Sequence, residues 1–428
     1  MRIADLPERQ ADRYIEALQA FQPYRQLLIK VGGGLLEDKA AVQELAEALT
    51  ELARRDIHTL VVHGGGPQLS AALKQYNVEP RFIDGKRYTD EATLKLAKVT
   101  FEGLSEELLQ VFSAAGIKTA VIPAVELFEA KQDSKLGLVG TEITSIDTET
   151  VMDTMKSHPV LVVHSLARNE ADGTTLNVNA DTIFRALATE MKPHRMVSLT
   201  PTGGVLQSID DSGSQSLING IDIRDVDTLI KDKTVTGGMA LKLRELANIL
   251  NELEIGSAIS ITKPSELLLE LLTDEGSGTF VGKGQKIITA HSTAEVFENL
   301  SSVIQEVFGK SLPEGYDTWP VKRVYFTKDL LAFGIVTSLA DGTPYLDKLA
   351  VSPQLQGRGI GQNLWYRITK DYPAIVWRSH VDNRYATWYH RHADIMKRSG
   401  EWILFGRDVD FTRLEALEEE LVNIPAMR

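Results

Sequence analysis

Short apolar runs alternate with longer stretches of helical periodicity through residues 25–262. We predict β-strands at Leu27–Val31, Thr59–Val62, Thr119–Pro123, Val160–Val163, Met196–Thr200 and Ser257–Ile261. Helical patterns lie between them at Ala40–Arg55, Thr89–Ala115, Ala180–Met191 and Met239–Glu252. Such alternation is typical of an α/β domain, in which helices cover a parallel sheet. Ligands of these sheets bind beyond the carboxyl ends of the strands.

A second α/β pattern begins near residue 287, after turn-rich segments at 274–279 and 282–284 that we interpret as the end of the first domain. Its predicted elements are a helix at 293–308, strands at Val321–Thr327, Leu331–Ser338 and Pro344–Val351, a helix at Gln362–Tyr372 and a strand at Ala374–Arg378. The final stretch, Arg413–Val422, reads as an acidic helix or tail.

Residues 1–24 form a predicted helical arm with apolar residues at Ile3, Leu6, Tyr14, Leu18 and Phe21. Two interpretations stay open for the arm, a terminal helix docked on the first domain or a contact between subunits. The predicted organisation is therefore an arm (1–24), a first domain (25–285) and a second domain (286–428).

Composition narrows the class of protein. The 428-residue chain has a formal net charge of −13, which argues against nucleic acid or an anionic membrane as the main partner. It has no cysteine, so disulfides, thiolate nucleophiles and Cys-ligated zinc are excluded. The N-terminus lacks the apolar core of a signal peptide, and no apolar run is long enough to span a bilayer. We expect a cytoplasmic protein. His380, His390 and His392 are poorly spaced for a metal site, and we expect no metal there.

Glycine-rich turns follow strand-like runs at two distant places. The first place has Gly32–Gly34 after one strand and Gly64–Gly66 after the next, and the second has the segment 351–361. Glycine lets backbone N–H groups converge on an anion, and the N-terminus of a following helix adds partial positive charge. Two unlike phosphate cradles indicate two active sites for two nucleotide-type ligands.

The first cradle is accompanied by charged residues suited to phosphoryl transfer. Lys30 precedes its glycines, and Lys242 follows the glycines Gly237 and Gly238 at the start of a predicted helix. Transfer of a phosphoryl group depends mostly on positioning and charge neutralisation, which two lysines and clustered amides provide. Asp181 is a candidate to orient the lysines, and Arg87 to clamp a carboxylate.

These elements resemble the amino-acid kinase family, and within it the acetylglutamate kinases. The resembling segments are Lys30–Gly33, His63–Pro67, Gly85–Thr89, Asn177–Asp181 and Thr236–Lys242. The resemblance implies that Lys30 and Lys242 stabilise the transferring phosphoryl group and that Asp181 organises them. It also implies that Gly32 and Gly33 bind ATP, with Mg²⁺ bridging its phosphates. Gly64, Gly65, Arg87 and Asn177 would hold N-acetyl-L-glutamate.

The segment Leu271–Thr279 resembles the arginine-binding segment of the arginine-inhibited members. By this resemblance, Glu270 would pair with the guanidinium of L-arginine, and the amides around Gly276 and Gly278 would meet its carboxylate. The alternative is a simple turn that ends the domain.

The second cradle fits a Q-x-x-G-x-G turn between a strand and a helix. Its residues Gln356, Gly357, Arg358, Gly359 and Gly361 are suited to a pyrophosphate. With the preceding Leu349–Pro353 segment, the turn resembles motif A of the GNAT acetyltransferases, which implies a GNAT fold that binds acetyl-CoA.

Residues around this turn resemble the vertebrate-type N-acetylglutamate synthase domain. The resemblance implies that Lys348 and Arg378 bind carboxylates of L-glutamate, that Asn383 lies near the reacting centre, and that Tyr389 protonates the departing CoA thiolate. A phenol with a pKa of about 10 suits that role, because it keeps its proton at neutral pH. Without cysteine, a Cys acyl-enzyme is impossible, so the glutamate amine would attack directly. Ala386 and Ala393–Ile395 depart from the family pattern. Tyr389 as aromatic packing and Lys348 as a solvent-facing residue remain alternatives.

Together the patterns predict an amino-acid kinase fold, a parallel-rich sheet sandwiched by helices, followed by a GNAT domain. The leading hypothesis is an arginine-inhibited, bifunctional synthase and kinase, and the resemblance favours a homo-oligomer, a tetramer above all. One alternative is a synthase whose kinase-like domain is only an arginine sensor. Another is a ligand-regulated acetyltransferase of protein lysines.

Overall fold

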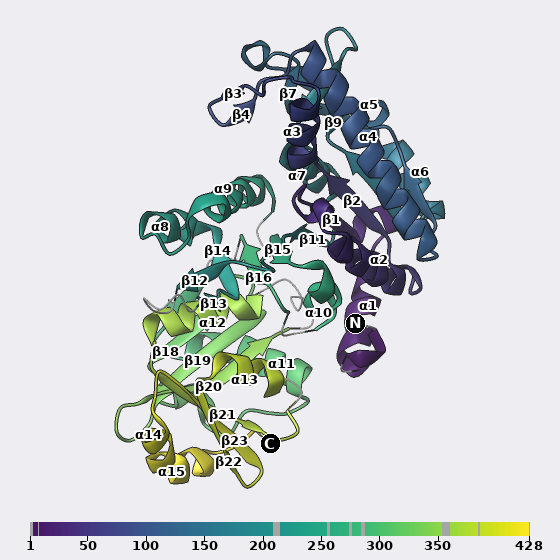
Figure 1. Cartoon of the computed structure of the whole chain (residues 1–428). Coiled ribbons are helices and arrows are strands. Elements are labelled where there is room, and N and C mark those ends of the chain that lie inside the picture. The colour runs from purple at the N-terminus through teal and green to yellow at the C-terminus, as the bar shows by residue number, and fades with distance from the viewer. Residues whose placement is uncertain are drawn as a thin grey trace. The chain divides into compact units, whose positions relative to one another are not determined.

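The computed structural model describes residues 3–6, 8–208, 215–254, 257–273, 276–283, 287–352, 360–383 and 386–427 (Figure 1). The chain forms two compact units. The first comprises Met1–Asn219, Val226–Leu253 and Ile259–Val281, and the second comprises Gly220–Asp225, Glu254–Ala258 and Gly282–Arg428. The domain boundaries after residues 24 and 285 stay predictions.

The main sheet has eight strands in the order β14-β16-β15-β11-β1-β2-β8-β5, and the six from β15 to β5 pair in parallel. Every residue of β1, β2 and β8 is buried, as expected for parallel strands covered on both faces. The bounds are β1 Leu27–Val31, β2 Thr59–His63, β5 Thr119–Val121, β8 Val160–His164, β11 Arg195–Leu199, β14 Gly220–Asp222, β15 Ala258–Thr262 and β16 Thr279–Gly282.

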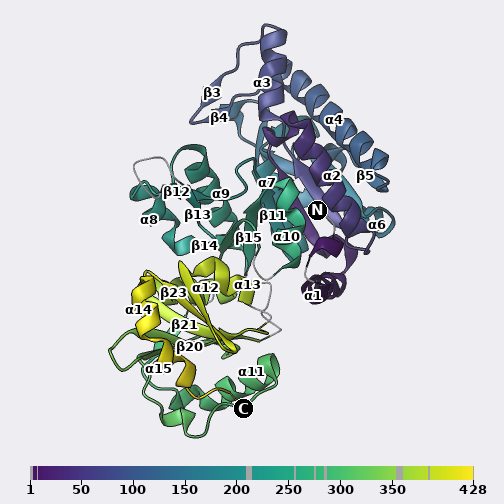
Figure 2. The ribbon, with the colours of Figure 1, turned by 60° about the horizontal axis from the view of Figure 1, so that its bottom comes forward.

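Helices cover both faces of this sheet. One face packs against α1, α2, α4 and α10 in a shared apolar core, and α7 lies against β1 and β2 and contacts α9 (Figure 2). Asp38, Asp90 and Asp147 cap the N-termini of α2, α4 and α6, which explains where these helices begin. The bounds are α1 Glu8–Gln19, α2 Lys39–Ala53, α3 Gly66–Gln75, α4 Glu91–Ala114, α5 Ala124–Leu127, α6 Thr148–Ser157, α7 Ala180–Met191, α8 Val226–Lys231, α9 Gly237–Glu252 and α10 Leu267–Leu272.

The N-terminal arm is docked on the first unit. Ile3, Leu6 and Leu18 are buried in the core that also holds α2 and α10, and Tyr14 packs against it. The ring of Phe21 stacks on His194 at a centroid distance of 4.2 Å. The described residues of the arm therefore form a docked helix, and the contact between subunits stays a prediction.

A small closed barrel and two hairpins complete the first unit, and none of them was predicted. Polar and charged residues interrupt the apolar pattern of the barrel strands, and the hairpin strands have only two or three residues. The barrel order is β10-β7-β6-β9, and the hairpins are β3–β4 and β12–β13. The bounds are β3 Phe82–Ile83, β4 Lys86–Arg87, β6 Phe128–Gln132, β7 Val139–Ile146, β9 Leu166–Asn169, β10 Thr175–Val178, β12 Leu206–Ser208 and β13 Gln215–Leu217.

The second unit contains a seven-stranded sheet in the order β17-β18-β19-β20-β21-β23-β22. One apolar core forms under α12 and α13 and another under α11, on opposite faces of the sheet. The strands are β17 Ile288–Ala290, β18 Arg323–Phe326, β19 Ala332–Ser338, β20 Pro344–Val351, β21 Ile375–His380, β22 Ile395–Ser399 and β23 Trp402–Arg407. The helices are α11 Phe297–Phe308, α12 Ile360–Asp371, α13 Ala386–His392, α14 Phe411–Ala416 and α15 Glu418–Asn423.

Strands β20 and β21 form the parallel pair of this sheet, and they separate early. They are paired only at Tyr345 with Val376 and at Leu346 with Trp377. On its other side β20 has a bulge, because Leu346 pairs with Val336 and Lys348 with Ile335, which leaves Asp347 as an extra residue. The strands diverge beyond this point, where the predicted acetyl-CoA turn follows β20.

The predicted strands and long helices agree with the structure within a few residues at each end. The predicted acidic helix or tail near the C-terminus is a pair of short helices, α14 and α15. The segment after 274 is more than a terminating turn, because β16 adds a strand to the main sheet. Eight short 3₁₀ turns connect the described elements. Among the described helices, none combines the length and the apolar character that crossing a membrane requires.

Candidate active sites

A cavity of about 670 Å³ opens at the carboxyl ends of β1 and β2 in the first unit. This is where a parallel sheet is expected to bind its ligand. Strand β1, the glycine turn after β2, the start of α3, hairpin β3–β4, the barrel, α7 and α9 all contribute to its wall. The predicted site residues in the lining are Lys30, Gly32, Gly33, Gly64, Gly65, Arg87, Asn177 and Asp181.

Lys30 and Asp181 form an ion pair at the base of the cavity. The Nζ atom of Lys30, near the end of β1, donates to Oδ1 of Asp181 in the first turn of α7. Their side chains are 9% and 16% exposed, so solvent screens the attraction only weakly. The N-terminus of α7 also favours a carboxylate at this position. The predicted pairing of this lysine and this carboxylate is present in the structure.

Helix α9 brings a second lysine and a second carboxylate to the same place. Burial, and next the charge of Lys30, lower the pKa of Lys242 to about 8. Burial, and next the charge of Asp181, raise the pKa of Glu245 to about 7, and Glu245 shares a hydrogen bond with Asp181. The sequence analysis missed Glu245. It lies three residues after Lys242, on the same face of α9, and that spacing was the signal available.

The two glycine turns pack closely against each other. A Cβ on Gly33 would lie 2.8 Å from Cδ of Pro67, and one on Gly65 would lie 2.7 Å from Cδ1 of Leu104 and 2.8 Å from the ring of Phe101. Side chains cannot be added at these two positions without displacing neighbours. Gly32 and Gly64 have more room, with no contact closer than 3.4 Å.

Arg87 reaches the cavity from β4 with part of its guanidinium already bound. Its Nη2 donates to Oγ of Ser70 at 2.7 Å and to the carbonyl oxygen of Gly66 at 3.3 Å. Its Nη1 is buried and donates to no acceptor among the described residues. A buried donor without an acceptor costs free energy, so a ligand carboxylate would be stabilised here. Asn177 donates to Oγ1 of Thr89 at 3.0 Å from the barrel side.

The residues predicted to bind arginine contact one another. Oε2 of the buried Glu270 accepts hydrogen bonds from the backbone N–H groups of Ser277, at 2.7 Å, and Gly278, at 2.9 Å. Gly276 has a φ of +59°, which favours glycine, and a Cβ on Gly278 would lie 1.9 Å from the carbonyl oxygen of Ile261. The carboxylate expected to face a guanidinium therefore occupies the amides expected to face a ligand carboxylate.

In the second unit, the predicted pyrophosphate turn lies mostly outside the described residues. Gln356, Gly357, Arg358 and Gly359 are among the residues that the structure does not describe. Gly361 is the second residue of α12, and its nearest neighbour for an added Cβ is Cγ2 of Val351 at 3.7 Å.

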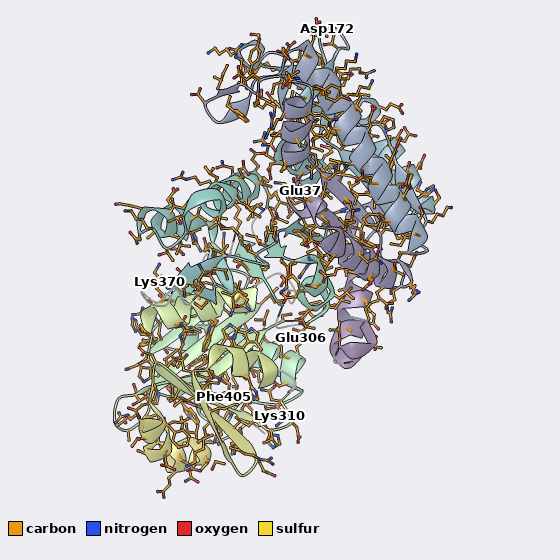
Figure 3. All side chains as sticks on the ribbon, in the orientation of Figure 1. Glu37, Asp172, Glu306, Lys310, Lys370 and Phe405 are labelled. Carbon is orange, nitrogen blue, oxygen red and sulfur yellow. The ribbon has the colours of Figure 1, made fainter. Side chains whose placement is uncertain are left out.

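The strand end before this turn is anchored. Ser352 is fully buried, and its Oγ donates at 2.9 Å to Oε2 of Glu306, which is labelled on α11 in Figure 3. The strand and the helix that flank the turn are therefore both held by packing or hydrogen bonds of their own.

The bulge in β20 directs two consecutive charges into the same buried region. Nζ of Lys348 lies 2.8 Å from Oδ1 of Asp347, and the two side chains are 7% and 3% exposed. The hydroxyl of the buried Tyr316 donates to the other carboxylate oxygen, and its ring lies 5.3 Å from Nζ of Lys348. The alternative of a solvent-facing Lys348 is wrong. Asp347 and Tyr316 were not among the predicted residues. Side chains of consecutive strand residues normally point to opposite faces of a sheet, and only the bulge brings those of Asp347 and Lys348 together.

Arg378 has different partners from those predicted. Its Nη1 donates to the carbonyl oxygens of Leu421, at 2.6 Å, and Val422, at 2.8 Å, and its Nη2 donates to that of Ile424. The guanidinium also stacks 3.8 Å from the ring of Trp402. These carbonyls belong to the C-terminal end of α15, where a cation is favourable. In this structure Arg378 holds that helix to β21.

Tyr389 lies on α13 within an aromatic cluster. Its ring is 5.4 Å from Trp388, 6.1 Å from Trp377 and 5.7 Å from Phe405, which is labelled in Figure 3. Tyr389 remains partly exposed beside this core. The cluster orients the ring, which suits a catalytic hydroxyl as well as packing. Asn383 lies just after β21, and its N–H donates to the carbonyl oxygen of His380 at 2.9 Å.

Comparison with known proteins agrees with both halves of the fold. The model of the amino acid kinase family matches residues 25–259. The chain belongs to the amino acid kinase family. Residues 288–422 match the model of the N-acetyltransferase domain of N-acetylglutamate synthase. The chain is thus a transferase with a kinase domain and an acyltransferase domain.

Several similar proteins match over nearly the whole of this chain. Acetylglutamate kinase of Xylella fastidiosa (strain 9a5c) is 30% identical over 402 residues, which cover 93% of each chain. The mitochondrial protein arg-6 of Neurospora crassa is 29% identical over 90% of this chain and 45% of that protein. N-acetylglutamate synthase from Neisseria gonorrhoeae, solved with coenzyme A and L-arginine, has the same fold, with a TM-score of 0.58, 16% identity and 96% of each chain covered.

The close packing at Gly65 predicts a large difference between two adjacent glycines. We expect Gly65→Ala to destabilise the first unit by about 1–3 kcal/mol, because its Cβ would overlap Phe101 and Leu104. Gly66→Ala is the matched control, since nothing lies within 4 Å of that Cβ, and it should stay within about 0.5 kcal/mol of wild type. Urea unfolding followed by far-UV circular dichroism measures both. Equal effects would contradict the packing described.

The raised pKa of Glu245 predicts a pH-dependent stability. The folded state keeps this proton up to about pH 7, whereas the unfolded chain loses it near its ordinary pKa of 4.5, so its stabilising contribution is lost as pH rises between these values. We therefore expect Glu245→Gln to gain stability relative to wild type as the pH rises from 4.5 to about 7, and to keep a constant difference above that pH. Circular dichroism is the suitable probe, because all five tryptophans lie after residue 318.

Glu44→Gln, on the exposed face of α2, is the control and should show no such pH trend. A flat difference between Glu245→Gln and wild type across this range would mean that Glu245 is already ionised in the folded protein.

Proposed function

We propose that this chain is bifunctional. Its second unit acetylates L-glutamate with acetyl-CoA, and its first unit phosphorylates the resulting N-acetyl-L-glutamate with MgATP. The observation that carries the kinase assignment is the Lys30–Asp181 ion pair beside two glycine turns in one cavity, with Lys242 near enough to interact electrostatically with both members of the pair. Burying two lysine charges close together costs free energy. We interpret this costly arrangement as one that serves catalysis.

In the proposed kinase reaction, a γ-carboxylate oxygen of N-acetyl-L-glutamate attacks the γ-phosphorus of ATP, and ADP leaves. The charge that spreads over the phosphoryl oxygens would be neutralised by Lys30 and Lys242, which Asp181 keeps in place. The amides of the glycine turns would bind phosphate and carboxylate oxygens. The free Nη1 of Arg87 would take the α-carboxylate, and Asn177 the acetamido group.

Magnesium belongs to this site as part of the substrate MgATP. Asp181 and Glu245 are the carboxylates of the cavity base, and both already interact with protein groups. The phosphate oxygens of ATP would therefore be the main ligands of the ion.

In the proposed acetyl transfer, the neutral amine of L-glutamate attacks the thioester carbonyl of acetyl-CoA, and the C–S bond breaks. Tyr389 would give a proton to the departing sulfur while the new amide nitrogen loses one to solvent. Lys348 and Asn383 would bind glutamate near the divergence of β20 and β21. Arg378 is left out of this proposal, because backbone carbonyls already bind its guanidinium.

We further propose that L-arginine regulates the protein at the segment around Glu270. The arginine carboxylate would take the amides of Ser277 and Gly278, and the released Glu270 carboxylate would pair with the guanidinium. The support is the buried carboxylate and the tight glycine turn that present these groups together.

One preparation of the full chain tests the whole proposal. CoA release from acetyl-CoA and L-glutamate is measured beside ADP release from MgATP and N-acetyl-L-glutamate, each with and without L-arginine. Both activities should be present, and arginine should reduce at least one. CoA release without ADP release would leave a synthase with a sensor domain. Acetylation of a lysine peptide in preference to glutamate would identify a protein acetyltransferase instead.

Separate sites predict separable losses. Lys242→Ala should reduce ADP release by about 10³-fold or more, the scale for removing a charge that stabilises a transition state, and should leave CoA release unchanged. Lys74→Ala, an exposed lysine on α3, is the control and should match wild type in both assays. Loss of both activities in Lys242→Ala would refute independent sites.

The role of Tyr389 predicts a loss confined to acetyl transfer. Tyr389→Phe keeps the aromatic packing and removes the hydroxyl, so CoA release should slow by about 10²-fold, as for loss of a general acid. A thiol reagent can follow the reaction continuously, because the chain has no cysteine to react with it. Tyr372→Phe is the control. An unchanged rate in Tyr389→Phe would reduce Tyr389 to a packing residue.

A further inference from the structure

Two histidines and a serine form a buried cluster directly behind the glycine turn of β2. His63 is the last residue of β2, His164 is the last residue of β8, and the two are register partners in the sheet. Ser105 lies on α4 and faces both rings. The three residues are 0%, 2% and 0% exposed, so the cluster is closed to solvent.

The hydrogen bonds of this cluster run in one direction. Nδ1 of His63 lies 2.9 Å from the carbonyl oxygen of Gly64, which can only accept, so Nδ1 carries the proton and Nε2 must accept. Oγ of Ser105 lies 2.8 Å from this Nε2 and is its donor. Nδ1 of His164, 3.3 Å from the same Oγ, then donates to it. Ser105 Oγ is also 3.1 Å from the carbonyl of Phe101, but donation there would leave the buried Nε2 without a donor.

The charge states of His63 and His164 agree with this direction of hydrogen-bond donation. Burial lowers the pKa of His63 to about 4. Burial lowers the pKa of His164 to about 3, with a smaller contribution from the charges of His63 and Lys98. Both imidazoles are therefore neutral near pH 7, and each has one N–H. A chain of single donors from His164 through Ser105 and His63 to Gly64 requires this state.

We propose that the chain His164, Ser105, His63 positions the phosphoryl-acceptor side of the kinase site by holding the carbonyl of Gly64. A peptide unit is planar and trans, so its C=O and N–H point in opposite directions. With the Gly64 carbonyl held toward His63, the N–H of Gly65 is directed away from the sheet, toward the cavity that Gly64 and Gly65 line. The inference rests on the proposed kinase activity.

Helix α4 also restricts the position of Gly65, from the other side of the turn. Phe101 and Leu104, within one turn of Ser105, exclude any side chain at Gly65, whose backbone has a φ of −168° and a ψ of 35°. One helix therefore both packs the turn and orients the histidine that binds its carbonyl. These residues touch no substrate and act through Gly65, so their role is positioning.

Two substitutions of His63 separate positioning from packing. The side-chain amide of His63→Asn can reach the place of Nδ1 and keep the bond to Gly64, whereas that of His63→Gln reaches the place of Nε2 and loses it. Glutamine is closer to histidine in volume. If the chain positions Gly65, His63→Asn keeps more kinase kcat than His63→Gln. If the residue only fills space, the order is reversed, and the proposal is overturned.

Removing the middle link gives a second test. Ser105→Ala should lower the kinase kcat on the order of tenfold, as expected for one misplaced donor, with KM for ATP and the rate of CoA release unchanged. Ser113→Ala, exposed on the same helix, is the control and should match wild type. A Ser105→Ala enzyme with wild-type kcat overturns the inference.

A spectroscopic measurement tests the chain without any assay. In protein labelled with ¹⁵N-histidine, with His63→Asn and His164→Gln used to assign signals, both rings should be neutral near pH 7 with the proton on Nδ1. A proton on Nε2 of His63 overturns the inference even if the kinase is active. Absence of ADP release by wild type instead overturns the proposed kinase function, so the two failures are distinguishable.

Discussion

The ion pair between Lys30 and Asp181 is the constraint on which the kinase cavity depends. Lys30 lies on the central β1 strand, where every residue is buried, and an unpaired ammonium there would be strongly destabilising. Asp181 supplies the opposite charge from the first turn of α7, whose N-terminus favours an anion. The pair therefore joins the end of the sheet to the start of a helix. Burial is the main cause of the lowered pKa of Lys242 and of the raised pKa of Glu245, and the charges of Lys30 and Asp181 respectively add to these shifts.

In the second unit, a β-bulge brings buried charged side chains together. One extra residue in β20 turns Asp347 and Lys348 toward the same buried region, and Tyr316 closes the arrangement. On the neighbouring strand, Arg378 binds the last carbonyls of α15. Arg378 thus holds the C-terminal part of the chain in place.

Much of this architecture could be predicted from the sequence, for identifiable reasons. Continuous apolar runs such as Val160–Val163 mark buried parallel strands, and motif spacing located Lys30, Asp181 and Lys242. The features that could not be predicted depend on three-dimensional contacts, which leave no periodic pattern in the sequence. The bulge at Asp347 reverses the usual alternation of side chains, and the capture of Arg378 requires a helix 43 residues away in sequence. The barrel strands carry too many polar and charged residues for an apolar pattern to distinguish them from loops.

Glu270 accepts hydrogen bonds from the amides of Ser277 and Gly278. This internal carboxylate therefore competes with any ligand carboxylate for the same two N–H groups. Any incoming carboxylate must displace an internal one that is tethered and always present. Its apparent affinity is then its intrinsic affinity reduced by the fraction of molecules in which Glu270 has moved away. At the proposed arginine site, strengthening or weakening this one internal contact would therefore shift the ligand concentration needed for binding, without any change to the other residues of the proposed site.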